Sequence, residues 1–319
     1  MSVVAGCSLF DGVLLAADCR ATFKRKNGDD VYSDNVLKVF ALFPHTAIGF
    51  VGAIDVASYL LKTLITQLRN RKHTDPISLS NWFSRLFQYE FKKYTTQYGD
   101  RTVHFMVASV LKGRPNVVER KAVVDLVKYI GFDKSPIKRN FMPSILIEIL
   151  KTSNRFKLVK IPGTSQGMLY VLASPAFKII PYNPLQFAAI GSGESSVQEI
   201  ARYHDAILAL EPGNSFVEGS QFRQVIQNFI QEKGIESVGG LYPAVKVSGN
   251  GIEHLAISQT IPAGGTRIEL AFQSGRWLQR NVTTGKEIPI LMPWEFLKIQ
   301  PSINNKFDDL IEAFKHFRD

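Results

Sequence analysis

The chain has 319 residues, of which 45% are hydrophobic and 21% are charged, and its formal net charge is +10. These values are typical of a folded globular protein and exclude disordered, collagen-like and coiled-coil chains. No run reaches the roughly 20 apolar residues of a membrane span, and no basic residue precedes the apolar N-terminus, so we expect neither a membrane helix nor a signal peptide. The two cysteines, Cys7 and Cys19, cannot form a disulfide framework, which favours a reducing cytoplasm.

The chain begins with residues typical of strands. Two apolar runs, residues 3–9 and 12–18, flank an Asp-Gly turn that is characteristic of a hairpin. A polar loop at residues 24–30 precedes two more predicted strands, 36–40 and 46–51. We therefore expect four strands before the first helix.

From Asp55 the apolar residues recur at helical spacing, which predicts a helix to residue 68 and a second one over residues 80–98. The remaining predicted elements are strands at 103–111, 168–174 and 186–190, helices at 196–210 and 216–233, and strands at 242–247 and 252–257. This order suits two stacked sheets with helix pairs outside. We expect an α+β fold, a four-layer α-β-β-α sandwich.

Two segments fall outside this pattern. We assign residues 1–258 to one domain, interrupted by a basic insertion at about 112–167, and residues 259–319 to a C-terminal extension that ends in an amphipathic helix at 305–317. Residues 111–160 hold 12 Lys or Arg and 4 acidic residues, a net charge of +8. Such a block can hold nucleic acid or an acidic partner, but a solvated surface is its commoner use.

Ser2 follows Met1 directly. If Met1 is removed, Ser2 carries a hydroxyl and a free α-amine on one residue. A serine hydroxyl is a weak nucleophile at its ordinary pKa, whereas an N-terminal amine with a pKa of about 7.7 to 8.0 is a base near neutral pH. One terminal residue can then supply both nucleophile and base.

Four segments carry a resemblance to a known family. Residues 11–22 (DGVLLAADCRAT) resemble the first hairpin of proteasome β-type subunits and their bacterial peptidase relatives. Lys38 looks like the active-site lysine of that family, residues 49–52 followed by Asp55 look like its glycine turn into the first helix, and residues 189–193 are similar to its glycine-serine-glycine motif. Four motifs in the right order are more specific than any one alone.

The resemblance implies the proteasome-like fold of N-terminal nucleophile (Ntn) hydrolases, with Ser2 at the position of the nucleophile. It further implies that the amine of Ser2 or Lys38 moves the proton and that Asp18 keeps Lys38 charged. Backbone N–H groups at Gly52 would form the oxyanion hole, beside the positive end of a helix dipole.

Arg20 and Ser192 lie inside the matching motifs and complete the candidate site residues. The family carries Thr where this chain has Ser2, and both hydroxyls can act as nucleophiles. The resemblance also implies a peptide or small-amide substrate and a homo-oligomer, which in the family is a ring. The sequence identifies no ATPase partner.

We expect no cofactor and no metal. The six histidines form no HExxH motif and no pair at helical spacing, and the glycine-serine-glycine motif lacks the third glycine of a dinucleotide loop. Two interpretations remain. The first is an amide-cleaving enzyme that uses Ser2, and the second is a catalytically inactive scaffold that binds partners through the basic insertion and the C-terminal extension. Retention of Met1 would favour the second.

Overall fold

The computed structural model describes residues 2–8, 12–24, 30–43, 45–68, 76–99, 101–111, 166–182, 187–191, 223, 226, 238–255, 257–260 and 267–297. Within them the protein has a mixed α/β fold with several antiparallel sheets and few helices. Among these described residues, no helix is long and apolar enough to cross a membrane.

The first five-stranded sheet combines strands from the start of the chain with strands from residues 187–254. Its strands run in the spatial order β10-β1-β2-β11-β12, and each neighbouring pair is antiparallel. The strands are β1 (Val3–Ser8), β2 (Gly12–Ala17), β10 (Phe187–Gly191), β11 (Ala244–Ser248) and β12 (Gly251–His254). Every residue of β1 and β2 is buried, so these central strands are covered on both faces.

The second five-stranded sheet follows the chain in order, β5-β6-β7-β8-β9, again with antiparallel pairing. Its strands are β5 (Val39–Phe43), β6 (Thr46–Gly52), β7 (Val103–Leu111), β8 (Gln166–Ala173) and β9 (Lys178–Tyr182). Only the β5–β6 and β8–β9 pairs are joined by short connections, since α1 and α2 separate β6 from β7 and residues 112–165 separate β7 from β8 in the chain.

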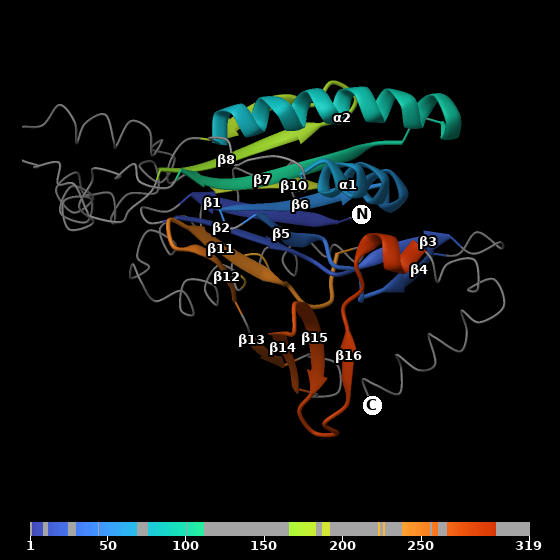
Figure 1. The fold of residues 1–319 in the computed structure, drawn as a ribbon. Helices are drawn as coiled ribbons and strands as arrows, with labels where there is room; N and C mark the ends of the chain where they lie inside the picture. The colour runs from blue at the N-terminus through green and yellow to red at the C-terminus, as the bar shows by residue number, and fades with distance from the viewer. Residues whose placement is uncertain are drawn as a thin grey trace, which may run out of the picture.

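Two helices, α1 (Ile54–Leu68) and α2 (Pro76–Tyr98), cover one face of the second sheet (Figure 1). The apolar face of α2 packs through aromatic rings. The ring of Phe87 lies 4.6 Å from that of Phe105 in β7 and 5.6 Å from that of Phe177 in the β8–β9 turn.

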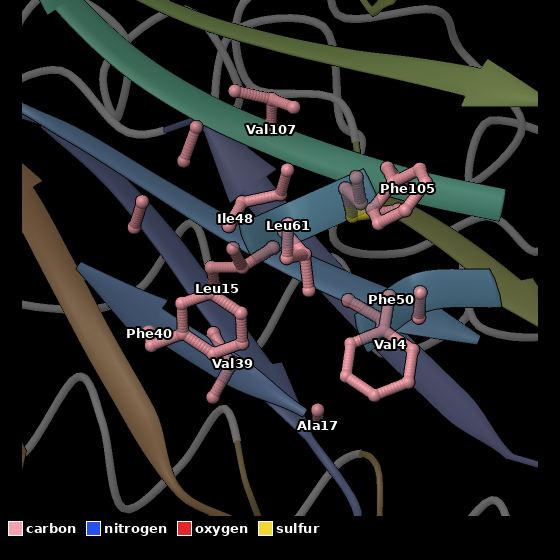
Figure 2. Packing of buried hydrophobic residues seen from close by; sticks show 14 of the residues in the cluster. Val4, Leu15, Ala17, Val39, Phe40, Ile48, Phe50, Leu61, Phe105 and Val107 are labelled. Carbon is pink, nitrogen blue, oxygen red and sulfur yellow. The ribbon is translucent and has the colours of Figure 1, made fainter. Parts of the chain in front are cut away.

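The main core lies between the two sheets. Val4 and Leu15 from the first sheet belong to the same buried cluster as Ile48, Phe50 and Phe105 from the second, and Figure 2 shows these side chains together. Because side chains of a strand alternate between its faces, the other residues of β1 and β2 point to the opposite side. There Val3, Ala5, Cys7, Leu14 and Ala16 form a second cluster.

The C-terminal extension contributes a four-stranded antiparallel sheet in the order β13-β14-β15-β16. Its strands are β13 (Ile257–Thr260), β14 (Arg267–Gln273), β15 (Arg276–Asn281) and β16 (Glu287–Pro289), drawn below the first sheet in Figure 1. The boundary predicted at residue 258 therefore falls inside β13.

The expectation of four strands before the first helix is wrong, because six strands precede it among the described residues. The additional pair, β3 (Ala21–Lys24) and β4 (Asp30–Ser33), forms a two-stranded antiparallel hairpin. These four-residue strands are rich in polar residues, so they looked like part of the loop. The strand predicted from residue 36 begins at Val39, because Val36 instead forms a bridge with Leu291.

Three other differences from the predicted elements appear in the structure. The single strand predicted over 252–257 is interrupted, and its two parts, β12 and β13, belong to different sheets. Strand β9 was missed because it is an edge strand with exposed apolar residues and a proline, Pro181, features that blur a strand pattern. The helix predicted from residue 80 starts at Pro76, a favourable first helical residue.

Several predicted elements lie outside the described residues. These are the basic insertion except for its last two residues in β8, the helices at 196–210 and 216–233 except for residues 223 and 226, and the helix at 305–317.

Candidate active site

The topology brings Ser2, Asp18 and Lys38 to one end of the stacked sheets. Ser2 immediately precedes β1, and Asp18 immediately follows β2. Because β1 and β2 are antiparallel with Val4 opposite Ala17, the start of one strand meets the end of the other. Lys38 immediately precedes β5 in the facing sheet.

The Lys38 ammonium lies between the other two side chains. Its Nζ donates to Ser2 Oγ at 2.7 Å and to the two carboxylate oxygens of Asp18 at 2.9 and 3.0 Å. It also donates to the carbonyl oxygen of Arg20. Ser2 is 8% exposed, Asp18 0% and Lys38 1%, so this hydrogen-bonded group is shielded from bulk water.

The carboxylate of Asp18 has two further donors. The backbone N–H of Val3 donates to Oδ1 at 2.9 Å and that of Arg20 donates to Oδ2 at 3.1 Å. Burial raises the pKa of Asp18, while the Lys38 charge and these hydrogen bonds act in the opposite direction. The buried carboxylate therefore depends on Lys38 and the two N–H groups to offset its desolvation.

Arg20 contributes its backbone to this group and its side chain to a neighbouring ion pair. Its Nε donates to Asp34 Oδ1 at 2.6 Å and its Nη2 donates to Asp34 Oδ2 at 3.0 Å, a bidentate arrangement. The hydrogen bonds with Asp34 raise the pKa of Arg20. The guanidinium also lies 5.3 Å from the ring centre of Tyr32. Sequence reasoning missed Asp34, because an acidic residue in a polar hairpin carries no signal of its partner.

Gly191, at the end of β10, allows close approach to Ser2. Its φ is +87°, and a Cβ atom there would lie 2.1 Å from the carbonyl oxygen of Ser2 and 3.0 Å from Cγ1 of Val51. Both the backbone conformation and the space therefore require glycine. The same contacts show that the end of β6, which carries Val51 and Gly52, is adjacent to the nucleophile candidate.

Gly191→Ala is expected to destabilise the fold. The left-handed backbone conformation alone costs a side chain about 1 to 3 kcal/mol, and the contact with backbone at Ser2 adds to that loss. Gly275→Ala is the matched control, because Gly275 has a φ of +77° and nothing within 4 Å of its Cβ position. Urea unfolding should show a clearly larger loss for Gly191→Ala, and equal losses would mean that the close approach to Ser2 is unimportant for stability.

Gly52 ends β6 with a φ of +102°. Phe50 N–H donates to the carbonyl oxygen of Lys38 at 3.0 Å, and Ala53 N–H donates to that of Thr102 at 3.0 Å. Because successive N–H groups of a strand point to opposite edges, the N–H of Gly52 points to the same edge as that of Phe50, toward the Lys38 side. Helix α1 begins two residues later. This direction suits the predicted oxyanion role, which stays a prediction.

The remaining candidate residues add little to the description of the site. Ser192 lies outside the described residues, and so does the Gly-Ser-Gly motif after Gly191. Cys19 is fully buried, and burial raises the pKa of its thiol, which makes it a poor nucleophile. In the part of the chain that the structure describes, no three His, Cys, Asp or Glu side chains could hold a metal ion together.

Comparison with known protein families gives a match in the N-terminal part of the chain. Residues 2–125 match the family model described as "Proteasome subunit". The matched segment starts at Ser2 and contains Asp18, Arg20, Lys38 and Gly52. A search of curated proteins gave no match. The match supports an Ntn hydrolase- or peptidase-like scaffold at a coarse level, and the resemblance noted in the sequence is confirmed: residues 2–125 of the chain match the proteasome subunit family.

Proposed function

We propose that the protein is an N-terminal serine hydrolase that cleaves amide bonds, with peptides as the substrate class, and that Ser2 becomes the nucleophile once Met1 is removed. The observation that carries this proposal is the 2.7 Å hydrogen bond from Lys38 Nζ to Ser2 Oγ, within a buried ion pair with Asp18. A neighbouring ammonium stabilises an alkoxide and lowers the pKa of the hydroxyl.

The proton can be followed through the reaction. Ser2 Oγ attacks the substrate carbonyl, and the free α-amine of Ser2 accepts the hydroxyl proton, because the Lys38 ammonium is already a donor to Oγ. The Gly52 N–H stabilises the negative charge that forms on the carbonyl oxygen. The leaving amine takes the proton, an ester remains on Ser2, and water then hydrolyses that ester with the same amine as base.

The proposal also includes the arrangement of the layers in the fold and the oligomeric state. The four-layer α-β-β-α sandwich that we propose is supported by the helices α1 and α2 and by the two five-stranded sheets, which would be three of its layers. The fourth layer is supported by Arg223 and Ile226, which are helical and buried, with Ile226 packed in the cluster on the outer face of the first sheet. Following the family, we propose a homo-oligomer in the cytoplasm.

The test combines intact mass with an activity assay. We expect the mature protein to lack Met1 and to hydrolyse at least one member of a panel of fluorogenic peptidyl amides with different side chains beside the scissile bond. A chain that keeps Met1, or one that lacks Met1 and hydrolyses none of the panel, would overturn the proposal and favour the inactive scaffold.

A further inference from the structure

The C-terminal extension is attached firmly to the domain that holds the site. His254 of β12 stacks on Phe272 of β14 with ring centres 3.6 Å apart, and Trp277 of β15, which is 1% exposed, lies edge-on to both rings. Such aromatic contacts are directional and bury a large area. The extension is therefore held where it can contact and support neighbouring segments of the domain.

One of those segments is residues 34–37, which lead directly into Lys38. Leu291 N–H donates to the carbonyl oxygen of Asn35 at 3.0 Å, and Leu37 N–H donates to the carbonyl oxygen of Leu291 at 2.8 Å. These two bonds form an isolated parallel bridge between Val36 and Leu291. The segment lies before β5 begins, so the extension supplies backbone partners where the sheet does not.

Gln279 of β15 holds the start of the same segment. Its side-chain Nε2 donates to the carbonyl oxygen of Asp34 at 2.9 Å and lies 3.5 Å from Asn35 Oδ1. Asp34 in turn makes the bidentate pair with Arg20, whose backbone contacts both Asp18 and Lys38. A polar chain of contacts thus runs from the extension to the buried ion pair.

Apolar contacts support the same segment. Phe296 is 5% exposed and packs with Ala21 and Val36 in one small cluster. Trp294 lies edge-on to Phe40 of β5, with ring centres 6.2 Å apart. Residues two positions before and two positions after Lys38 are thus both covered by aromatic side chains of the extension.

A buried lysine needs such support, because its flexible side chain carries about 2 kcal/mol of rotamer entropy and the hydrogen bond to Ser2 Oγ depends on where its backbone lies. We propose that Gln279, Leu291, Trp294 and Phe296, the C-terminal clamp, are positioning residues that hold residues 34–37 so that the Lys38 ammonium reaches Ser2 and Asp18 together. The consequence for activity rests on the proposed function, whereas the consequence for the placement of Lys38 does not.

The experiment compares Gln279→Met, which removes the donor at similar size, with Gln273→Met, an exposed position in β14 of the same sheet. We expect kcat for Gln279→Met to fall about 10-fold or more with KM unchanged, because a displacement near 1 Å can reduce a rate by about 100-fold. Gln279→Lys restores a donor and should recover much of kcat. Gln273→Met should behave as wild type.

A second measurement tests the position of Lys38 and does not depend on hydrolysis. Lys38 is buried, so reductive methylation with formaldehyde under native conditions should leave it largely unmodified in wild type and Gln273→Met. In Gln279→Met the modified fraction of Lys38, measured by peptide mass spectrometry, should rise several-fold while urea unfolding stays cooperative. Unchanged kcat together with unchanged protection of Lys38 would overturn the clamp. A rise in Lys38 modification without any hydrolysis by wild type would support the clamp and overturn the hydrolase.

Discussion

Lys38→Met should lower the rate of hydrolysis strongly and destabilise the protein in a way that depends on pH. Removing a group that stabilises the nucleophile and orders proton transfer lowers kcat by about 100- to 10,000-fold. It also leaves the carboxylate of Asp18 buried at 0% exposure without its counter-ion. Breaking a buried ion pair on one side destabilises a protein by about 3 to 5 kcal/mol.

The sign of the pH dependence follows from Asp18. Burial raises its pKa, and Lys38→Met removes the largest opposing influence. The folded variant then holds a proton on Asp18 that the unfolded chain releases near pH 4, so its free energy of unfolding falls as the pH rises from about 4 toward the raised pKa. Urea unfolding between pH 4 and 8 should show the variant closest to wild type at the acidic end.

Lys246→Met provides the control, because Lys246 is another buried lysine, which lies in β11 of the first sheet. It should change stability and leave hydrolysis per folded molecule near the wild-type value. Equal loss of hydrolysis in both variants would indicate that any buried lysine matters for folding and that Lys38 has no particular role at Ser2.

Ser2→Ala should have the largest effect on rate with little effect on stability. Loss of the nucleophile removes the covalent route, and enzymes that use one lose a factor on the order of 10⁴ to 10⁶ in kcat. The remaining contacts of Lys38 with Asp18 and the Arg20 carbonyl stay in place, so the fold should be retained.

Two further variants bracket this result. Ser2→Thr keeps a hydroxyl and should keep hydrolysis, since the extra methyl only restricts the side-chain rotamer. Ser8→Ala alters another buried serine, the last residue of β1, and should leave kcat unchanged. Rapid hydrolysis by Ser2→Ala would assign the nucleophile to a different residue.

Ser2, Asp18 and Lys38 could be identified as candidate site residues from the sequence, because each lies beside a strand that the local sequence pattern predicts. Ser2 and Asp18 flank two apolar runs joined by a short turn, so a hairpin brings them together whatever the rest of the chain does. Lys38 precedes an apolar strand, and the family resemblance predicted Ser2 and Asp18 as its partners, which lie at short distances from Nζ in the structure. The helical period likewise located α1 and α2.

The missed features are those that depend on contacts distant in sequence. Asp34 forms an ion pair with Arg20, and the side chain of Gln279 donates to the carbonyl oxygen of Asp34, 245 positions away. These polar residues follow no periodic pattern in the sequence. Val36 looks like part of a strand in the sequence, yet its partner is Leu291 in the extension. Such pairings arise only when the sheets have stacked, so composition and local period carry no trace of them.

The most direct test of the account is to trap the acyl intermediate and locate it. Wild-type protein treated with a peptide that carries a reactive β-lactone should gain one acyl group, and peptide mass spectrometry should place that group on the hydroxyl of an N-terminal Ser2, with no adduct in Ser2→Ala. An adduct on another residue, an adduct that persists in Ser2→Ala, or an unmodified Ser2 in protein that still hydrolyses amides would contradict the account.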